Sequence, residues 1–148
     1  MSVELYFLRS SESKIAQDMV KYARVSEHEK YTEFYGLTKK DLGLYALKDS
    51  RVVGAVWSRE IDGIPMLNVA VLPEYRKNSI ASFMLAQFLL EAGELYEEIH
   101  VEVNDTTSGF YKKYDFIRKS DSNIMYKRLE KKAVVRPSDG YDPTRWMD

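Results

Sequence analysis

The chain contains no cysteine, and only two of its 148 residues are histidine. The absence of cysteine excludes a disulfide framework, a thiolate nucleophile and a thiolate metal site. His28 and His100 lie far apart in the chain, so a zinc centre would have few ligands to draw on and we expect no metal. A chain without disulfides fits the cytoplasm, which is the location we predict.

The sequence also lacks long apolar runs and an excess of charge of one sign. No stretch approaches the roughly 18 apolar residues of a membrane span, and the N-terminal residues 1–7 have no secretory signal pattern. The formal net charge is −1, so broad attraction to nucleic acid is not expected. We therefore predict neither a membrane nor nucleic acid among its partners. With 45% hydrophobic and 30% charged residues, the composition is that of a globular domain.

The hydrophobic pattern predicts one α/β domain over residues 1–130. Strands are expected where apolar residues alternate or run together, and helices where they recur every three or four residues. The expected strands are Val3–Leu8, Leu44–Leu47, Val52–Trp57, Met66–Leu72, Ile99–Val103, Phe116–Ile117 and Ile124–Tyr126, and the expected helices start at Ser11 or Ser13 and span Ile80–Gly93 and Thr106–Tyr114. Residues 131–148 are polar and are predicted to form a tail or a docking arm, whose aromatic side chains are compatible with a homodimer.

The most informative segment joins the strand Met66–Leu72 to the helix Ile80–Gly93. Pro73 ends the strand, and the helix is expected to bury Ile80, Phe83, Met84, Phe88 and Leu89 on one face. The first N–H groups of a helix have no internal partner and carry partial positive charge, so such a corner binds a pyrophosphate. The residues predicted to form this phosphate corner are Arg76, Lys77, Asn78, Ser79, Ile80, Ala81 and Ser82.

This segment resembles the coenzyme A motif of the GNAT superfamily of N-acetyltransferases, in which Arg/Gln-x-x-Gly-x-Gly/Ala opens a helix after a proline. Arg76 and Ala81 match the motif, and Ser79 stands where the family usually has glycine. Glycine adopts positive φ freely and lets the backbone approach a phosphate. Serine narrows that freedom, although its hydroxyl can bond a phosphate or cap the helix. The departure bears on cofactor affinity more than on the fold.

A second segment, residues 104–116, is similar to the family's Asn followed by Phe/Leu-Tyr-Glu/Lys-Lys-x-Gly-Phe, with Asp115 in place of the glycine. The resemblance implies that Asn104 contacts the pantetheine arm and that Tyr111 lies near the thioester sulfur. A phenol can protonate or hydrogen-bond the leaving thiolate. The resemblance also implies that backbone N–H groups at Val69, Ala70 and Val71 stabilise the oxyanion of the reaction.

From Val3 to Leu129 the order of elements agrees with this family. The resemblance implies an α/β (α+β) fold with a mixed, mostly antiparallel twisted sheet, flanked by helices and splayed at its central strands. It further implies that acetyl-CoA is the co-substrate and that a primary amine of a peptide N-terminus, a lysine or a small molecule attacks the thioester directly. Two alternatives remain. One is the same fold without turnover, binding acyl-CoA or a protein, and the other is an unrelated α/β interaction domain.

The amine must lose a proton before it attacks, so the reaction needs a general base. Glu102 lies on a predicted strand next to the cleft, where some family members carry the base, and it is the first candidate, although an outward-facing strand residue needs no function. His100 shares its face, and Glu60 is a further candidate. Asn68 either points into the acceptor cleft or is a hydrogen-bonded core residue. The acidic, aromatic stretch Glu27–Tyr35 either lines a site for a cationic amine or forms a solvated helix.

Overall fold

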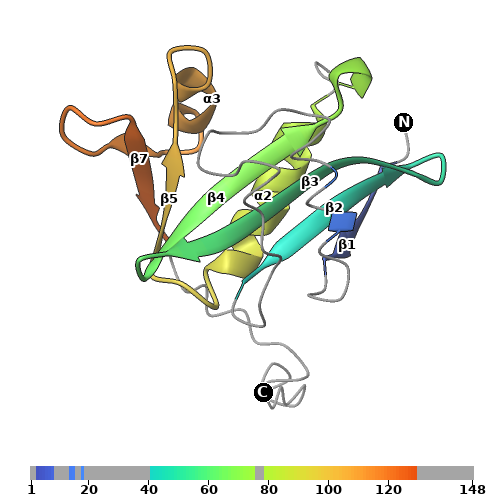
Figure 1. Cartoon of the computed structure of the whole chain (residues 1–148), viewed down its shortest axis with the longest axis horizontal. Helices are drawn as coiled ribbons and strands as arrows, with labels where there is room; N and C mark the ends of the chain where they lie inside the picture. The colour runs from blue at the N-terminus through green and yellow to red at the C-terminus, as the bar shows by residue number, and fades with distance from the viewer. Residues whose placement is uncertain (1–2, 9–13, 16–17, 19–40, 76–78, 130–148) are drawn as a thin grey trace, which may run out of the picture.

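The computed structural model describes residues 3–8, 14–15, 18, 41–75 and 79–129. Within these residues a 7-stranded sheet has the order β1-β2-β3-β4-β5-β7-β6 (Figure 1). The elements are β1 (Glu4–Phe7), β2 (Gly43–Lys48), β3 (Arg51–Ile61), β4 (Ile64–Val71), the 3-10 turn η3 (Pro73–Tyr75), α2 (Ile80–Ala92), β5 (Glu98–Glu102), α3 (Ser108–Lys112), β6 (Ile117–Arg118) and β7 (Ile124–Arg128). Most of the helix expected after Ser11 or Ser13 lies outside the described residues. No helix in the described part of the chain has the length and apolar character needed to cross a bilayer.

Two tight hairpins build the first half of the sheet. Asp49 and Ser50 close the hairpin of β2 and β3, and Asp62 and Gly63 close that of β3 and β4. All four residues have positive φ, between 51° and 81°. Two consecutive residues with positive φ give the type I′ turn, whose twist matches that of the flanking strands. Asp62-Gly63 is a dipeptide that favours this turn, because glycine adopts positive φ without strain.

The sheet opens between its two parallel strands. β4 pairs with β3 along its whole length, from Val71 opposite Gly54 to Ile64 opposite Ile61. In contrast, β4 and β5 pair in parallel at a single register position, Met66 opposite His100. The two strands diverge from there toward their carboxyl ends (Figure 1). The expected mixed, mostly antiparallel and centrally splayed sheet is confirmed.

Both faces of the central strands are buried. On one face α2 packs its buried residues Ile80, Met84, Leu85, Phe88 and Ala92 against a core that includes Leu67 and Ile99. On the other face a second cluster contains Leu8, Ala55, Trp57, Ala70 and Leu72, and the partly buried Ile15 packs against it. Burial on both faces explains why β4 is apolar at nearly every position.

The buried stripe of α2 differs from the expected one at Phe83. Ile80, Met84, Phe88 and Ala92 follow one another at intervals of four and point into the core. Phe83 lies on the flank of this stripe and is 48% exposed. The prediction that Phe83 belongs to the buried face was wrong, because α2 covers the sheet with a narrow stripe and Leu85 fills the remaining core position.

A glycine in β3 allows α2 to lie close to the sheet. A Cβ on Gly54 would lie 2.9 Å from the carbonyl oxygen of Ala70 and 2.9 Å from Cε of Met84. The Met84 side chain can move, but the Ala70 oxygen cannot without shifting β4. Gly54→Ala is therefore expected to lower the free energy of unfolding by about 1–3 kcal/mol, as overpacking does. Urea denaturation measures this change.

Gly109 provides the matched control for that variant. A Cβ there meets nothing within 4 Å, and Gly109 lies inside α3. Gly109→Ala should leave stability unchanged or raise it by up to about 1 kcal/mol, because alanine favours helix. Equal stability of the Gly54→Ala variant and the wild type would contradict the close packing of α2 on β3.

Candidate active site

The phosphate corner lies where η3 leads into α2. Phe83 N donates to Ser79 O at 3.0 Å, the first i→i−4 bond of the helix. The N–H groups of Ile80, Ala81 and Ser82 precede that bond and therefore face out of the helix end, where an anion can accept them. Arg76, Lys77 and Asn78 lie outside the described residues.

Two positions at which the sequence departs from the family's glycines have left-handed backbone. Ser79 has φ 62° and Asp115 has φ 68°. Glycine adopts this backbone conformation without strain. For a non-glycine residue it costs about 1–2 kcal/mol of free energy, so both positions are strained. The Ser79 side chain makes no capping hydrogen bond to α2, so the structure does not bear out the helix-cap role considered for its hydroxyl.

Backbone groups of β4 point into the gap between β4 and β5. Leu72 N donates to Val53 O of β3 at 2.9 Å. In a strand, the N–H and C=O of successive residues point to opposite sides. Ala70, two residues earlier, therefore points toward β3, whereas Val69 and Val71 point toward β5. Of the three predicted oxyanion residues, these two direct their N–H groups to the gap.

Tyr111 lies in α3 with its ring in the core. It is 6% exposed, and its ring meets Phe110 and Phe116 edge-on, with centroids 5.1 and 5.4 Å away. Burial raises the pKa of the Tyr111 phenol above its usual value. The hydroxyl therefore stays protonated at neutral pH and can act as a hydrogen-bond donor.

Asn104 closes the turn that starts α3. Its Oδ1 accepts from the backbone N of Thr106 at 2.8 Å and of Thr107 at 2.9 Å. The carboxamide oxygen of Asn104 is thus engaged in hydrogen bonds within the protein. The Nδ2 group is the part of Asn104 with which a pantetheine amide oxygen could bond.

Glu102 and His100 share one face of β5 but have different surroundings. His100 is 3% exposed, and its Nε2 lies 2.8 Å from Oε1 of Glu98. Its ring centroid is 5.9 Å from that of Tyr126. Glu102 is half-buried and ends β5, two residues beyond the last position paired with β4. Glu102 therefore lies at the gap, and His100 lies at the closed end of the two strands.

Of the remaining candidates that the structure describes, Glu60 lies away from the gap, whereas Asn68 lies two residues beyond Met66 on β4, as Glu102 does beyond His100 on β5. Glu60 is exposed on β3 opposite Pro65, on the side of Met66 away from the gap. Asn68 is 2% exposed and lies opposite Trp57, so it belongs to the buried face of the second cluster. The stretch Glu27–Tyr35 lies outside the described residues.

A family model for the acetyltransferase (GNAT) domain matches residues 39–118. The chain belongs to the GNAT acetyltransferase family. The matched residues include both segments on which the resemblance was based, and they exclude an unrelated α/β interaction domain. No curated protein sequence matches the chain.

Solved structures of other GNAT proteins share the fold over most of this chain. The ribosomal-protein-S18-alanine N-acetyltransferase from Escherichia coli is 14% identical, with a TM-score of 0.69 over 91% of this chain and 99% of that one. The PaiA N-acetyltransferase from Thermoplasma acidophilum, in complex with coenzyme A, is 22% identical, with a TM-score of 0.60 over 87% and 100%. Naa50 from Arabidopsis thaliana, bound to the bisubstrate analogue CoA-Ac-MVNAL, is 20% identical, with a TM-score of 0.63 over 87% and 100%. At these identities the likeness concerns the fold.

The sequence patterns of a GNAT domain did not point to Tyr75, which precedes the phosphate corner. Lys48 Nζ and Arg51 Cζ lie 5.5 and 5.6 Å from the centre of the Tyr75 ring, and Arg51 also bonds Glu74 at 3.2 Å. The β2–β3 hairpin thus holds the end of η3. No local signal in the sequence links these residues, because more than twenty positions separate Arg51 from Tyr75.

Proposed function

We propose that the protein transfers the acetyl group of acetyl-CoA to a primary amine. The observation that carries the proposal is the divergence of β4 and β5 beside the N-terminus of α2. This arrangement offers a slot for the pantetheine arm and a helix end for the pyrophosphate. In this proposal Arg76–Ser82 hold the phosphates, Asn104 holds the arm, and the cytoplasm remains the expected location.

The reaction needs the amine to be neutral. The amine nitrogen attacks the thioester carbonyl carbon, and negative charge develops on the carbonyl oxygen. The N–H groups of Val69 and Val71 would stabilise that charge. The carbon–sulfur bond then breaks, and coenzyme A leaves as a thiolate that receives a hydrogen bond from Tyr111. The proton lost by the nitrogen passes to Glu102 through one water.

The acceptor is a peptide N-terminus, a lysine side chain or a small amine. Two of the similar structures are described as an alanine N-acetyltransferase and as a complex with a bisubstrate analogue, which supports a peptide among these classes. Glu102 is half-buried at the gap, and its carboxylate would attract the ammonium form of any of them.

Ser79→Gly tests the phosphate corner. Glycine relieves the strain of φ 62°, so we expect stability to rise by about 1 kcal/mol and acetyl-CoA to bind several-fold more tightly. Calorimetric titration gives Kd, and a thermal shift reports binding, because a ligand at a hundredfold excess over Kd adds about 2.7 kcal/mol.

Asp115→Gly is the matched control, since it relieves a similar strain at φ 68° away from the corner. It should raise stability and leave Kd unchanged. Weaker binding by the Ser79→Gly variant would mean that the serine hydroxyl bonds a phosphate. An absence of heat and of thermal shift with millimolar acetyl-CoA would overturn the cofactor assignment.

A further inference from the structure

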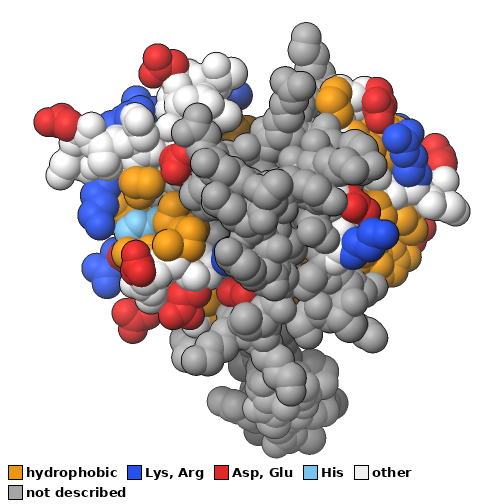
Figure 2. Space-filling model, viewed as in Figure 1, with side chains coloured by type: hydrophobic (Ala, Val, Ile, Leu, Met, Phe, Trp, Pro, Cys, Tyr) orange, Lys and Arg blue, Asp and Glu red, His pale blue; other side chains and the backbone are white. Residues whose placement is uncertain are grey.

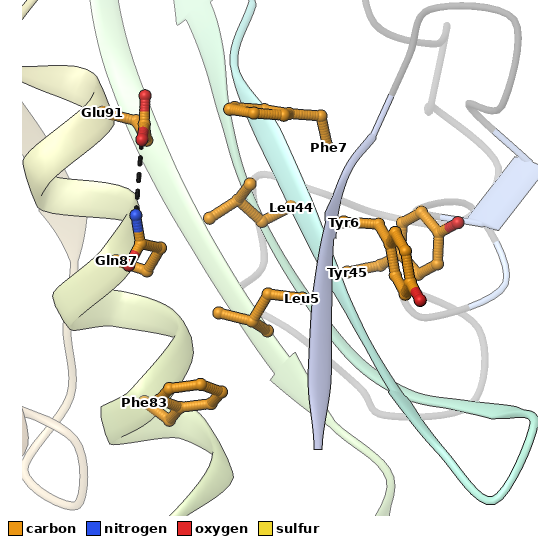
Figure 3. Close-up of a pocket in the computed structure, with 8 residues that line it drawn as sticks. All are labelled: Leu5, Tyr6, Phe7, Leu44, Tyr45, Phe83, Gln87 and Glu91. Carbon is orange, nitrogen blue, oxygen red and sulfur yellow. Dashed lines mark hydrogen bonds between the residues drawn. The ribbon is translucent and has the colours of Figure 1, made fainter. Parts of the chain in front are cut away.

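A groove of about 660 Å³ lies between α2 and the edge of the sheet (Figure 3). Its walls include Leu5 and Phe7 of β1, Leu44 of β2, and Phe83, Gln87 and Glu91 of α2. Figure 3 shows the side chains of Leu5 and Leu44 pointing across the groove toward α2. The groove is separate from the gap between β4 and β5, because β3 lies between them in the sheet.

The lining of the groove fits an aromatic side chain next to a cation. Phe7 is 56% exposed and Phe83 is 48% exposed, so two large apolar rings border it. At one end Gln87 Nε2 donates to Glu91 Oε1 at 3.3 Å. A carboxylate accepts several hydrogen bonds at once, so Glu91 can also bind a guanidinium. This end lies in the last turn of α2.

The described chain leaves the fold close to that end of α2. Leu129 N donates to Glu97 O at 2.8 Å, and Glu97 follows α2 by five residues. From β7 to β1 the sheet spans five strand intervals, or about 24 Å. Residues 130–135 reach at most about 20 Å beyond Leu129, whereas Tyr141 reaches about 40 Å and Trp146 more. Residues beyond about position 136 can therefore reach the β1 wall of the groove in their own chain.

We propose that Arg145, Trp146 and Met147 dock in this groove within the same chain. The Trp146 ring fills the apolar part beside Phe7 and Phe83, and the Arg145 guanidinium pairs with Glu91. Trp is the residue that buries the largest apolar area, and Arg binds a carboxylate through two parallel hydrogen bonds. Docking also covers β1, the last strand on this side of the described sheet, which would otherwise offer an edge for aggregation.

Disulfide trapping tests the docking directly, because the chain contains no cysteine. A variant with Gln87→Cys and Met147→Cys has only two thiols and keeps Trp146. Under dilute oxidising conditions we expect most of the protein to form an intramolecular disulfide, measured as a monomer by non-reducing electrophoresis and mass spectrometry. Adding Trp146→Ala should slow that reaction by tenfold or more.

The control places the first cysteine at the opposite edge of the sheet. Ile117 of β6 is 59% exposed and Gln87 is only partly exposed, so a variant with Ile117→Cys and Met147→Cys places its first thiol at a more accessible position. Its disulfide should form at least tenfold more slowly. Equal rates for the two pairs, disulfide-linked dimers in place of monomers, or insensitivity to Trp146→Ala would each overturn the proposal. Retained melting temperatures confirm that the variants are folded.

Discussion

Tyr111→Phe is expected to lower kcat by about 10²-fold or more, the size of effect found when one hydrogen-bond donor to a developing anion is removed. The buried phenol has a raised pKa, so it donates a hydrogen bond to the departing thiolate more readily than it gives up its proton. The variant loses this donor and keeps the ring contacts with Phe110 and Phe116. Binding of acetyl-CoA should be nearly unchanged, because the bond forms as the thiolate leaves.

Steady-state kinetics and a separate calorimetric Kd distinguish these effects. Tyr96→Phe is the control, since Tyr96 Oη bonds Ser58 Oγ at 2.7 Å at the far end of α2 from the phosphate corner. That variant should keep kcat. If Tyr111→Phe also keeps kcat, Tyr111 serves only for packing and water protonates the thiolate.

Glu102→Gln is expected to lower kcat/KM most strongly at neutral pH. Glutamine keeps the size of the side chain and removes its charge and basicity. Near pH 7 an alkyl amine is almost fully protonated, so loss of the base should cost about 10²-fold or more. As the pH rises toward the pKa of the amine, free amine accumulates and the rate should recover. A pH profile of kcat/KM with one amine measures this.

Glu98→Gln separates proton transfer from general electrostatics. Glu98 lies on the same face of β5, but it bonds His100 at the closed end of the strands. The Glu98→Gln substitution removes an equal charge from the same strand and should leave the pH profile of kcat/KM unchanged. His100→Gln should have a smaller effect than Glu102→Gln. A Glu102→Gln variant with the wild-type profile would exclude Glu102 as the base and favour a chain of waters.

Features that depend on local sequence were predictable. The continuous apolar run of β4 and the alternation in β5 fixed both strands to within two residues. The two motifs pointed to the phosphate corner and to the turn before α3. The left-handed backbone at Ser79 and Asp115 agrees with the glycines that the family has at these two positions, because a backbone with positive φ favours glycine.

Features that depend on contacts between distant residues were not predictable. Phe83 has the same spacing as a core residue, and only the way in which α2 lies on the sheet shows that it is exposed. The pairing of His100 with Glu98 requires the burial of β5 between β4 and β7. Likewise, the position of Arg51 beside Tyr75 follows from the β2–β3 hairpin. His100 is buried, a setting that its neighbours in sequence do not reveal. Figure 2 shows one face of the molecule, on which hydrophobic side chains of the described residues gather on either side.

The release of free coenzyme A from acetyl-CoA, measured with a thiol reagent, tests the central claim most directly. Because the protein has no cysteine, every thiol detected comes from coenzyme A. The assay uses a panel of peptides with free N-termini, lysine-containing peptides with blocked N-termini and small primary amines, and mass spectrometry identifies the acetylated product. The account predicts amine-dependent thiol release, matched by product, with at least one member of the panel. Binding of acetyl-CoA without any amine-dependent release across the panel would contradict it and favour an acyl-CoA-binding domain without turnover.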